Sequence, residues 1–156
     1  MSTDPLSALA AVPNACQALP GVITGGQPRA EQLAAFKAAG GALVLDIRDP
    51  AEPRPMDEPA TARELGLEYV AVPVSAATLS DATLERIRDV LRTAEGRTAF
   101  FHCASGNRVG AALIPHLVLD QGIPEEDAVS TAVRVGLRSP ELRDWALDYI
   151  RRQRNP

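Results

Sequence analysis

The segment of residues 98–110, TAFFHCASGNRVG, most constrains what this chain can fold into. An apolar run leads through His102 and Cys103 into a turn of small residues, and an apolar helical pattern begins after Arg108. This order predicts a buried strand, a tight turn and a helix. The backbone N–H groups of such a turn and the positive end of the helix dipole together favour binding of an anion.

The cysteine at the start of this turn is the candidate nucleophile. A thiol placed among oriented amides at a helix N-terminus is expected to form its thiolate near neutral pH. Arg108 adds a planar guanidinium that can bind two oxygens of an oxyanion at once. We therefore expect the anion to be bound by the loop amides and the arginine side chain, which belong to Ala104, Ser105, Gly106, Asn107 and Arg108.

Short apolar runs alternate with helical patterns along the chain. Four runs predict strands, at residues 21–24, 42–47, 68–72 and 98–102. Six patterns predict helices, at residues 29–39, 60–65, 81–94, 108–121, 125–135 and 139–153. Because the strands are apolar throughout and separated by helices, the fold class is predicted to be α/β, with a central, mostly parallel sheet flanked by helices.

The N-terminal part and one proline modify this plan. Residues 1–20 are rich in Ala, Ser and Pro and are expected to form a loose segment with at most one helical turn, over residues 6–11. Residues 21–156 are expected to form a single domain, because their number suits one hydrophobic core. Pro115 lies inside a predicted helix and should kink it.

Composition excludes several classes of function. The chain has 156 residues and a formal net charge of −4, which argues against a nucleic-acid surface. Two cysteines are too few for a disulfide framework, and Cys16 is expected to be a small apolar residue near the first strand. No spacing typical of metal ligands is present, so neither a metal nor another cofactor is expected.

The N-terminal residues and the apolar runs also bear on location. The first 20 residues make a poor signal peptide, and no apolar run reaches the roughly 20 residues of a membrane span. We therefore expect a soluble, cytoplasmic protein without a membrane partner.

Polar residues follow three of the predicted strands. These polar residues are Asp46 and Arg48 at or after the end of the second strand, Ser75 after the third and His102 at the end of the fourth. Binding sites in parallel sheets form at the carboxyl ends of the strands. Arg48 is expected to be a second contact for the anion or to form a surface salt bridge with Glu52 or Asp49. His102 is expected to be a buried, hydrogen-bonded side chain that orients the loop.

The loop resembles the signature of the cysteine-dependent tyrosine and dual-specificity phosphatases. His102, Cys103, Gly106 and Arg108 match that signature. Four residues separate Cys103 from Arg108, where those phosphatases have five, and a loop of this length resembles that of the sulfur-transferring rhodaneses. The segments TGGQP (24–28), LDIR (45–48) and LEYVAVPV (67–74), followed by the short loop, are similar to the bacterial beta-lactamase-hydrolase-like phosphatase-like family.

This resemblance covers most of the chain from about residue 21 and implies a dual-specificity-phosphatase fold. It implies an enzyme that hydrolyses phosphate monoesters of a phosphorylated substrate through a phosphocysteine on Cys103. Such phosphatases place a general acid after the strand that corresponds to 68–72, but Ser75 and Ala76 stand there. The remaining candidates for the acid are Asp81, Asp46 and Asp49, with Asp81 favoured by its place in the loop. Each of the three, taken singly, is also typical of a helix cap, strand end or turn.

Two other functions stay open at this point. A rhodanese-type sulfurtransferase would carry a persulfide on Cys103, accept sulfur from a sulfane-sulfur donor, and need no general acid. The short loop and the missing acid favour it. A catalytically inactive anion-binding module is the second alternative; the missing acid favours it, whereas the intact set of Cys103, Gly106 and Arg108 speaks against it.

Overall fold

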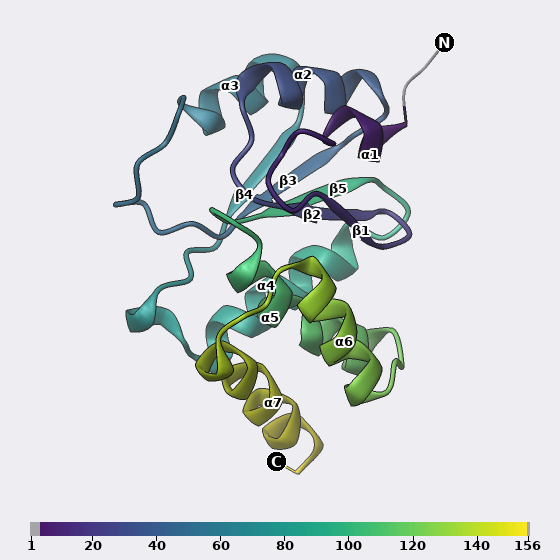
Figure 1. Ribbon diagram of the computed structural model, residues 1–156, viewed down its shortest axis with the longest axis vertical. Helices are drawn as coiled ribbons and strands as arrows, with labels where there is room; N and C mark the ends of the chain where they lie inside the picture. The colour runs from purple at the N-terminus through teal and green to yellow at the C-terminus, as the bar shows by residue number, and fades with distance from the viewer. Residues whose placement is uncertain (1–3, 156) are drawn as a thin grey trace.

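The computed structural model describes residues 4–155, and Figure 1 shows a central sheet between two layers of helices. The sheet has five strands in the order β1-β2-β5-β3-β4. Their bounds are Cys16–Leu19 for β1, Val22–Gly25 for β2, Leu43–Asp46 for β3, Glu68–Ala71 for β4 and Ala99–His102 for β5. Strand β1 pairs antiparallel with β2, and the other pairs are parallel. The predicted α/β class with a mostly parallel sheet is confirmed.

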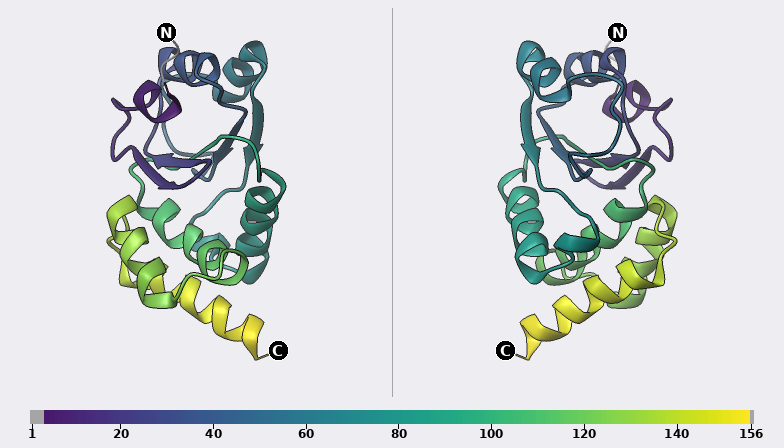
Figure 2. Two further views of the ribbon diagram at one scale, coloured as in Figure 1. Left: turned by 90° about the vertical axis from the view of Figure 1, so that its right-hand side faces the viewer. Right: turned by 90° about the vertical axis from the view of Figure 1, so that its left-hand side faces the viewer.

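Helices cover both faces of the sheet (Figures 1 and 2). One layer contains α1 (Pro5–Ala8), α2 (Ala30–Ala38) and α3 (Glu58–Leu65). The other contains α4 (Asp81–Thr93), α5 (Asn107–Pro115), α6 (Glu125–Val135) and α7 (Pro140–Arg154). A short 3₁₀ turn, Ala76–Thr78, precedes α4.

Each inner strand contributes side chains to both layers. On β5, Phe100 lies in the core beneath α2 and α3, whereas Phe101 lies in the core shared with α4 to α7. Val44 and Leu45 of β3 divide in the same way. Because successive residues of a strand point to opposite faces, a strand buried on both faces must be apolar throughout. This is why the continuous apolar runs predicted strands correctly.

The described part of the N-terminal segment is more regular than predicted. Residues 4–20 contain α1, which overlaps the expected helical turn, and the edge strand β1, which was not predicted; residues 1–3 lie outside the described residues. The side chain of Asp4 accepts a hydrogen bond from the Ser7 amide and caps α1. Strand β1 has four residues, none of them buried, so it gives no hydrophobic pattern to detect. Cys16, on this strand, is half-buried.

Pro115 ends the regular part of the long helix, as predicted. Helix α5 stops at this residue, and the chain continues as a π-helix over His116–Asp120. A proline inside a helix lacks the amide that would bond four residues back, so the hydrogen-bond pattern shifts there. None of the helices within residues 4–155 is long and apolar enough to cross a membrane.

The sheet brings the carboxyl ends of three strands to one edge. His102 is in register with Gly25 of β2 on one side and with Asp46 of β3 on the other. Gly26, which follows β2, is required for close approach, because a Cβ there would lie 2.5 Å from the Ala104 carbonyl oxygen. The Gln27 amide donates a hydrogen bond to that same oxygen at 3.2 Å. The turn after β2 therefore supports the Cys103 loop directly.

Candidate active site

The loop after β5 wraps around the sulfur of Cys103. The Gly106 amide donates a hydrogen bond to Cys103 Sγ at 3.1 Å, and the cysteine is only 1% exposed. Gly106 has a φ of 102°, which glycine adopts without strain, and a Cβ at this position would lie 2.7 Å from the Val135 carbonyl oxygen. Gly106 is therefore the left-handed residue of the turn.

Two asparagines fix the loop from either side. Asn14 Nδ2 donates to the Ser105 carbonyl oxygen at 2.6 Å. Asn107 Oδ1 accepts hydrogen bonds from the amides of Arg138 (2.8 Å) and Ser139 (3.3 Å), in the turn between α6 and α7. The Asn107 side chain therefore points away from the loop interior. Its amide, at the first position of α5, remains a candidate for binding an anion, because the first amides of a helix have no partner within the helix.

Arg108 is held by two acceptors. Its Nη1 donates to Glu52 Oε2 at 2.6 Å and to the Val74 carbonyl oxygen at 3.1 Å, and its Nη2 donates to Glu52 Oε1 at 2.8 Å. These bonds use three of the five guanidinium N–H groups. The Nε–H and the second Nη2–H remain, and together they form a fork suited to two oxygens of an oxyanion.

The charges around this guanidinium support one another. Hydrogen bonds from Arg108 hold the pKa of Glu52 below its ordinary value, although partial burial works in the opposite direction. The same bonds to Glu52 raise the pKa of Arg108. Partial burial works in the opposite direction, and negative charge on the Cys103 sulfur would add to the increase. The sequence offered Glu52 only as a surface partner of Arg48, because a loop of unknown path gives no sign that it reaches Arg108.

Arg48 lies in neither of its predicted places. Its side chain is fully buried, so it is no surface residue. Nη2 lies 2.8 Å from Asp46 Oδ2 and 2.9 Å from Glu58 Oε1, and Nη1 donates to Gln27 Oε1 at 2.7 Å. Because this fully buried side chain gives four of its five N–H groups to Asp46, Glu58 and Gln27, Arg48 is not placed to contact a bound anion. The prediction that it binds the anion is corrected.

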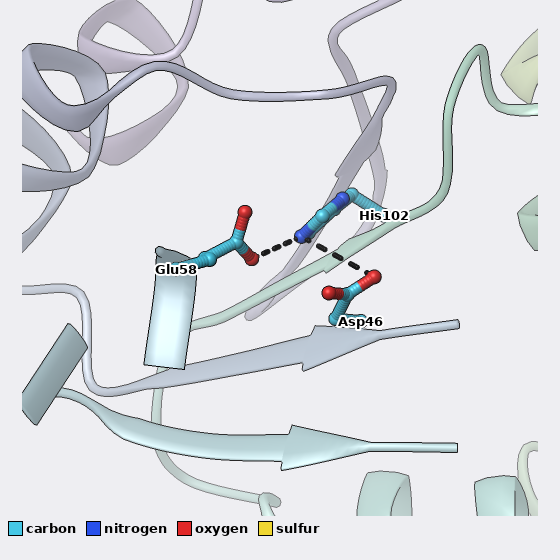
Figure 3. Close-up of side chains that lie close together, drawn as sticks. All are labelled: Asp46, Glu58 and His102. Atoms are coloured by element: carbon cyan, nitrogen blue, oxygen red, sulfur yellow. Dashed lines mark hydrogen bonds and ion pairs between the residues drawn. The ribbon is translucent and has the colours of Figure 1, made fainter. Parts of the chain in front are cut away.

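His102 is buried and hydrogen-bonded, as predicted. Figure 3 shows its ring between the carboxylates of Glu58 and Asp46. Nε2 lies 2.5 Å from Glu58 Oε2, Nδ1 lies 3.2 Å from the Cys103 carbonyl oxygen, and the ring stacks on Phe100. These contacts connect α3, which carries Glu58, to the backbone of Cys103.

The side chains of Asp46, Glu58 and His102 lie close enough together to be considered as metal ligands, which the sequence did not indicate. Ligand atoms of Asp46, Glu58 and His102 lie within 4.8 Å of one another. However, the Arg48 guanidinium bonds both carboxylates, and Arg54 Nη1 lies 3.1 Å from Asp46 Oδ2. The residues do not fit a metal, because cationic side chains already occupy the carboxylate oxygens.

The three predicted acids are engaged elsewhere. Burial raises the pKa of Asp46, but hydrogen bonds from Arg48 and Tyr69 and the charge of His102 outweigh it and hold this pKa far below its usual range. Asp49 Oδ1 accepts from the Ala51 amide at 2.9 Å. Asp81, with its pKa lowered by Arg152, forms two bonds of 2.6 and 2.9 Å to that arginine. Within residues 4–155, none of the three contacts Cys103 or Arg108.

The buried network predicts a large difference between two glutamates. Glu58→Gln should lower the free energy of unfolding by about 3 kcal/mol, because it leaves Arg48 with too little negative charge in a dry site. Glu68→Gln is the matched control, since Glu68 pairs with Arg97 at the surface, and it should cost less than about 1 kcal/mol. Urea unfolding of both variants measures this, and equal losses would show that the buried network contributes little.

The ion pair between Glu52 and Arg108 predicts a pH dependence. Because the folded-state pKa of Glu52 lies below its ordinary value of 4.5, the pair stabilises the fold fully above pH 4.5. This contribution is lost as the pH falls through the lowered value. Wild type should therefore exceed Glu52→Gln by about 1 kcal/mol in unfolding free energy at neutral pH. The difference should shrink as the pH falls below 4.5 and through the lowered pKa of Glu52; a difference that does not change with acidification would contradict the pairing.

Comparison with known proteins supports the resemblance seen in the sequence. No family model matches the chain. The beta-lactamase hydrolase-like protein of Xylella fastidiosa (strain Temecula1) is 31% identical over 87 residues, which are 53% of this chain and 20% of that protein. Its counterpart in Agrobacterium fabrum is 27% identical over 106 residues, 65% of this chain and 24% of that protein. The chain thus matches about a quarter or less of these relatives' length.

Solved structures resemble almost the whole chain. The DUF442 protein of Shewanella putrefaciens CN-32 has a TM-score of 0.79 at 20% identity, covering 94% of this chain and 97% of its own. Tk-PTP in its active form has a TM-score of 0.74 at 20% identity, covering 90% and 98%. TpbA of P. aeruginosa, solved in complex with pTyr, has a TM-score of 0.66 at 19% identity, covering 97% and 87%. The chain therefore has the dual-specificity-phosphatase fold and, as its motifs predicted, is similar in sequence to the beta-lactamase hydrolase-like proteins.

Proposed function

We propose that this chain is a cysteine-dependent phosphatase that hydrolyses phosphate monoesters through a phosphocysteine on Cys103. The observation that supports this most directly is the position of the Gly106 amide, 3.1 Å from Cys103 Sγ, at the start of a helix that carries Arg108. Oriented amides and a guanidinium fork with two free N–H groups suit the charge that develops on a transferred phosphoryl group.

The proposed reaction has two steps. The Cys103 thiolate attacks phosphorus, the P–O bond to the leaving group breaks, and a sulfur–phosphorus bond forms. Water then attacks phosphorus, releasing inorganic phosphate and restoring the thiolate. In both steps the amides of residues 104–108 and the free edge of Arg108 would stabilise the three equatorial oxygens. His102 would hold the loop through the Cys103 carbonyl.

Phosphorylated side chains or small phosphate esters are the proposed substrates. A hollow of about 340 Å³ lies beside Arg108 and offers space for the group that bears the phosphate. The TpbA structure with pTyr is a precedent within the same fold for a phosphorylated aromatic ligand. We further propose that the residues from 21 onward act as a single domain in the cytoplasm, without nucleic-acid partners, consistent with a net charge of −4.

Sulfur transfer is the second candidate. Its supporting observation is the close fit of the loop around Cys103, which is 1% exposed and separated from Arg108 by only four residues. A persulfide adds one sulfur atom, which needs less room than a phosphoryl group. A sulfane-sulfur donor would then be the substrate, and the donor's leaving group would need no general acid.

A paired assay distinguishes the two functions. Wild type should release phosphate from an aryl phosphate with a good leaving group, and Cys103→Ser should lose this activity by at least about a thousandfold, because it removes the nucleophile. The same proteins are tested for sulfur transfer from thiosulfate or glutathione persulfide. Cys103-dependent sulfur transfer without phosphate release would refute the phosphatase proposal.

Arg108→Lys tests the anion site separately from turnover. Lysine keeps the charge but loses the planar fork, so the affinity for inorganic phosphate or vanadate should fall about tenfold to a hundredfold. Calorimetric titration measures this affinity, with Arg97→Lys as a control because Arg97 pairs with Glu68 away from the loop. Unchanged affinity in Arg108→Lys would mean that this arginine does not contact the anion.

A further inference from the structure

The proposed phosphatase reaction needs a proton donor for the leaving oxygen, and the usual position for it holds Ser75 and Ala76. Both residues line the hollow beside Arg108. The start of α7 also lines this hollow and contributes Glu141. A carboxyl group therefore reaches the same hollow from a different element.

Glu141 differs from the other nearby carboxylates in having no partner. Among residues 4–155 it forms no ion pair and no side-chain hydrogen bond, and it is exposed. Glu52 is bound to Arg108 by both oxygens, and Asp81 is bound to Arg152 in the same way. A carboxylate committed to an arginine is a poor proton donor, because the guanidinium stabilises its ionised form. Among residues 4–155, Glu141 forms no such pair with an arginine.

The backbone that carries Glu141 is fixed to the Cys103 loop. Ser139 Oγ accepts a hydrogen bond from the Leu142 amide and caps α7, while Pro140 occupies the first helical position. The amide of Ser139 also donates to Asn107 Oδ1, and Asn107 follows Gly106 directly. The backbone of Glu141 lies two residues beyond this anchor, so its position relative to the Cys103 loop is fixed by the turn.

We propose that Glu141 is the general acid of the reaction, an inference that rests on the proposed phosphatase function. As the Cys103 thiolate attacks phosphorus and the P–O bond breaks, the Glu141 carboxyl gives its proton to the leaving oxygen. In the second step the resulting carboxylate takes a proton from the attacking water. The thiolate then leaves phosphorus, so that protons and electron pairs balance over the cycle.

Dependence on the leaving group tests this role. With phenyl phosphate, whose leaving oxygen needs a proton, Glu141→Gln should lower kcat/KM about a hundredfold. With 2,4-dinitrophenyl phosphate, whose leaving group departs as an anion, the loss should be within about threefold. Asp144→Asn is the matched control, because Asp144 lies one turn further along α7 and does not line the hollow beside Arg108.

The outcomes separate this inference from the function on which it rests. Equal losses for the two esters, or equal losses in Glu141→Gln and Asp144→Asn, would overturn Glu141 as the acid while leaving the phosphatase proposal standing. If wild type hydrolyses neither ester in a Cys103-dependent way, the phosphatase proposal fails and the inference fails with it. Because Glu141 is an exposed residue in the first turn of a capped helix, Glu141→Gln is expected to fold as wild type does.

Discussion

The active edge of this protein depends on a buried guanidinium. Arg48 bridges Asp46 at the end of β3 and Glu58 at the start of α3, and Glu58 in turn reaches His102 beside the nucleophile. Each of these charges would be costly to bury alone, so the set is stable only when every member is present. A strand, a helix and the cysteine-bearing strand are thereby fixed in one geometry.

The two arginines near the Cys103 loop, Arg48 and Arg108, consequently have different roles. Arg48 donates to groups inside the protein and is connected to the Cys103 loop through Glu58 and His102 on one side and through Gln27 on the other. Arg108 gives three N–H groups to Glu52 and Val74, and among residues 4–155 its other two form no hydrogen bond and could bind the proposed oxyanion. Sequence alone treated both as candidate anion contacts, because each follows a strand. What distinguishes them is whether carboxylates surround the side chain, and this depends on tertiary structure.

Local patterns predicted the fold well and the site in part. Apolar runs, glycines and prolines located β2 to β5 and the helices, because a residue's burial on one or both faces leaves a period in the sequence. The strand-end rule correctly brought Asp46 and His102 together. The contacts of Glu52 and Glu58 and the position of Glu141 beside Arg108 could not be predicted, since each depends on the path of a loop or on a helix distant in sequence. Strand β1 was missed because its side chains are not buried.

The pairing of both Glu52 carboxylate oxygens with Arg108 has a thermodynamic consequence. Glu52 belongs to the proline-rich loop between β3 and α3, so the order of that loop and the orientation of the guanidinium are linked equilibria. Such linkage is reciprocal. If binding of an oxyanion changes the equilibrium constant for the Glu52–Arg108 pairing by some factor, then forming that pairing changes the affinity for the oxyanion by the same factor. A partner or small molecule that binds this loop would therefore act on the active site without touching Cys103.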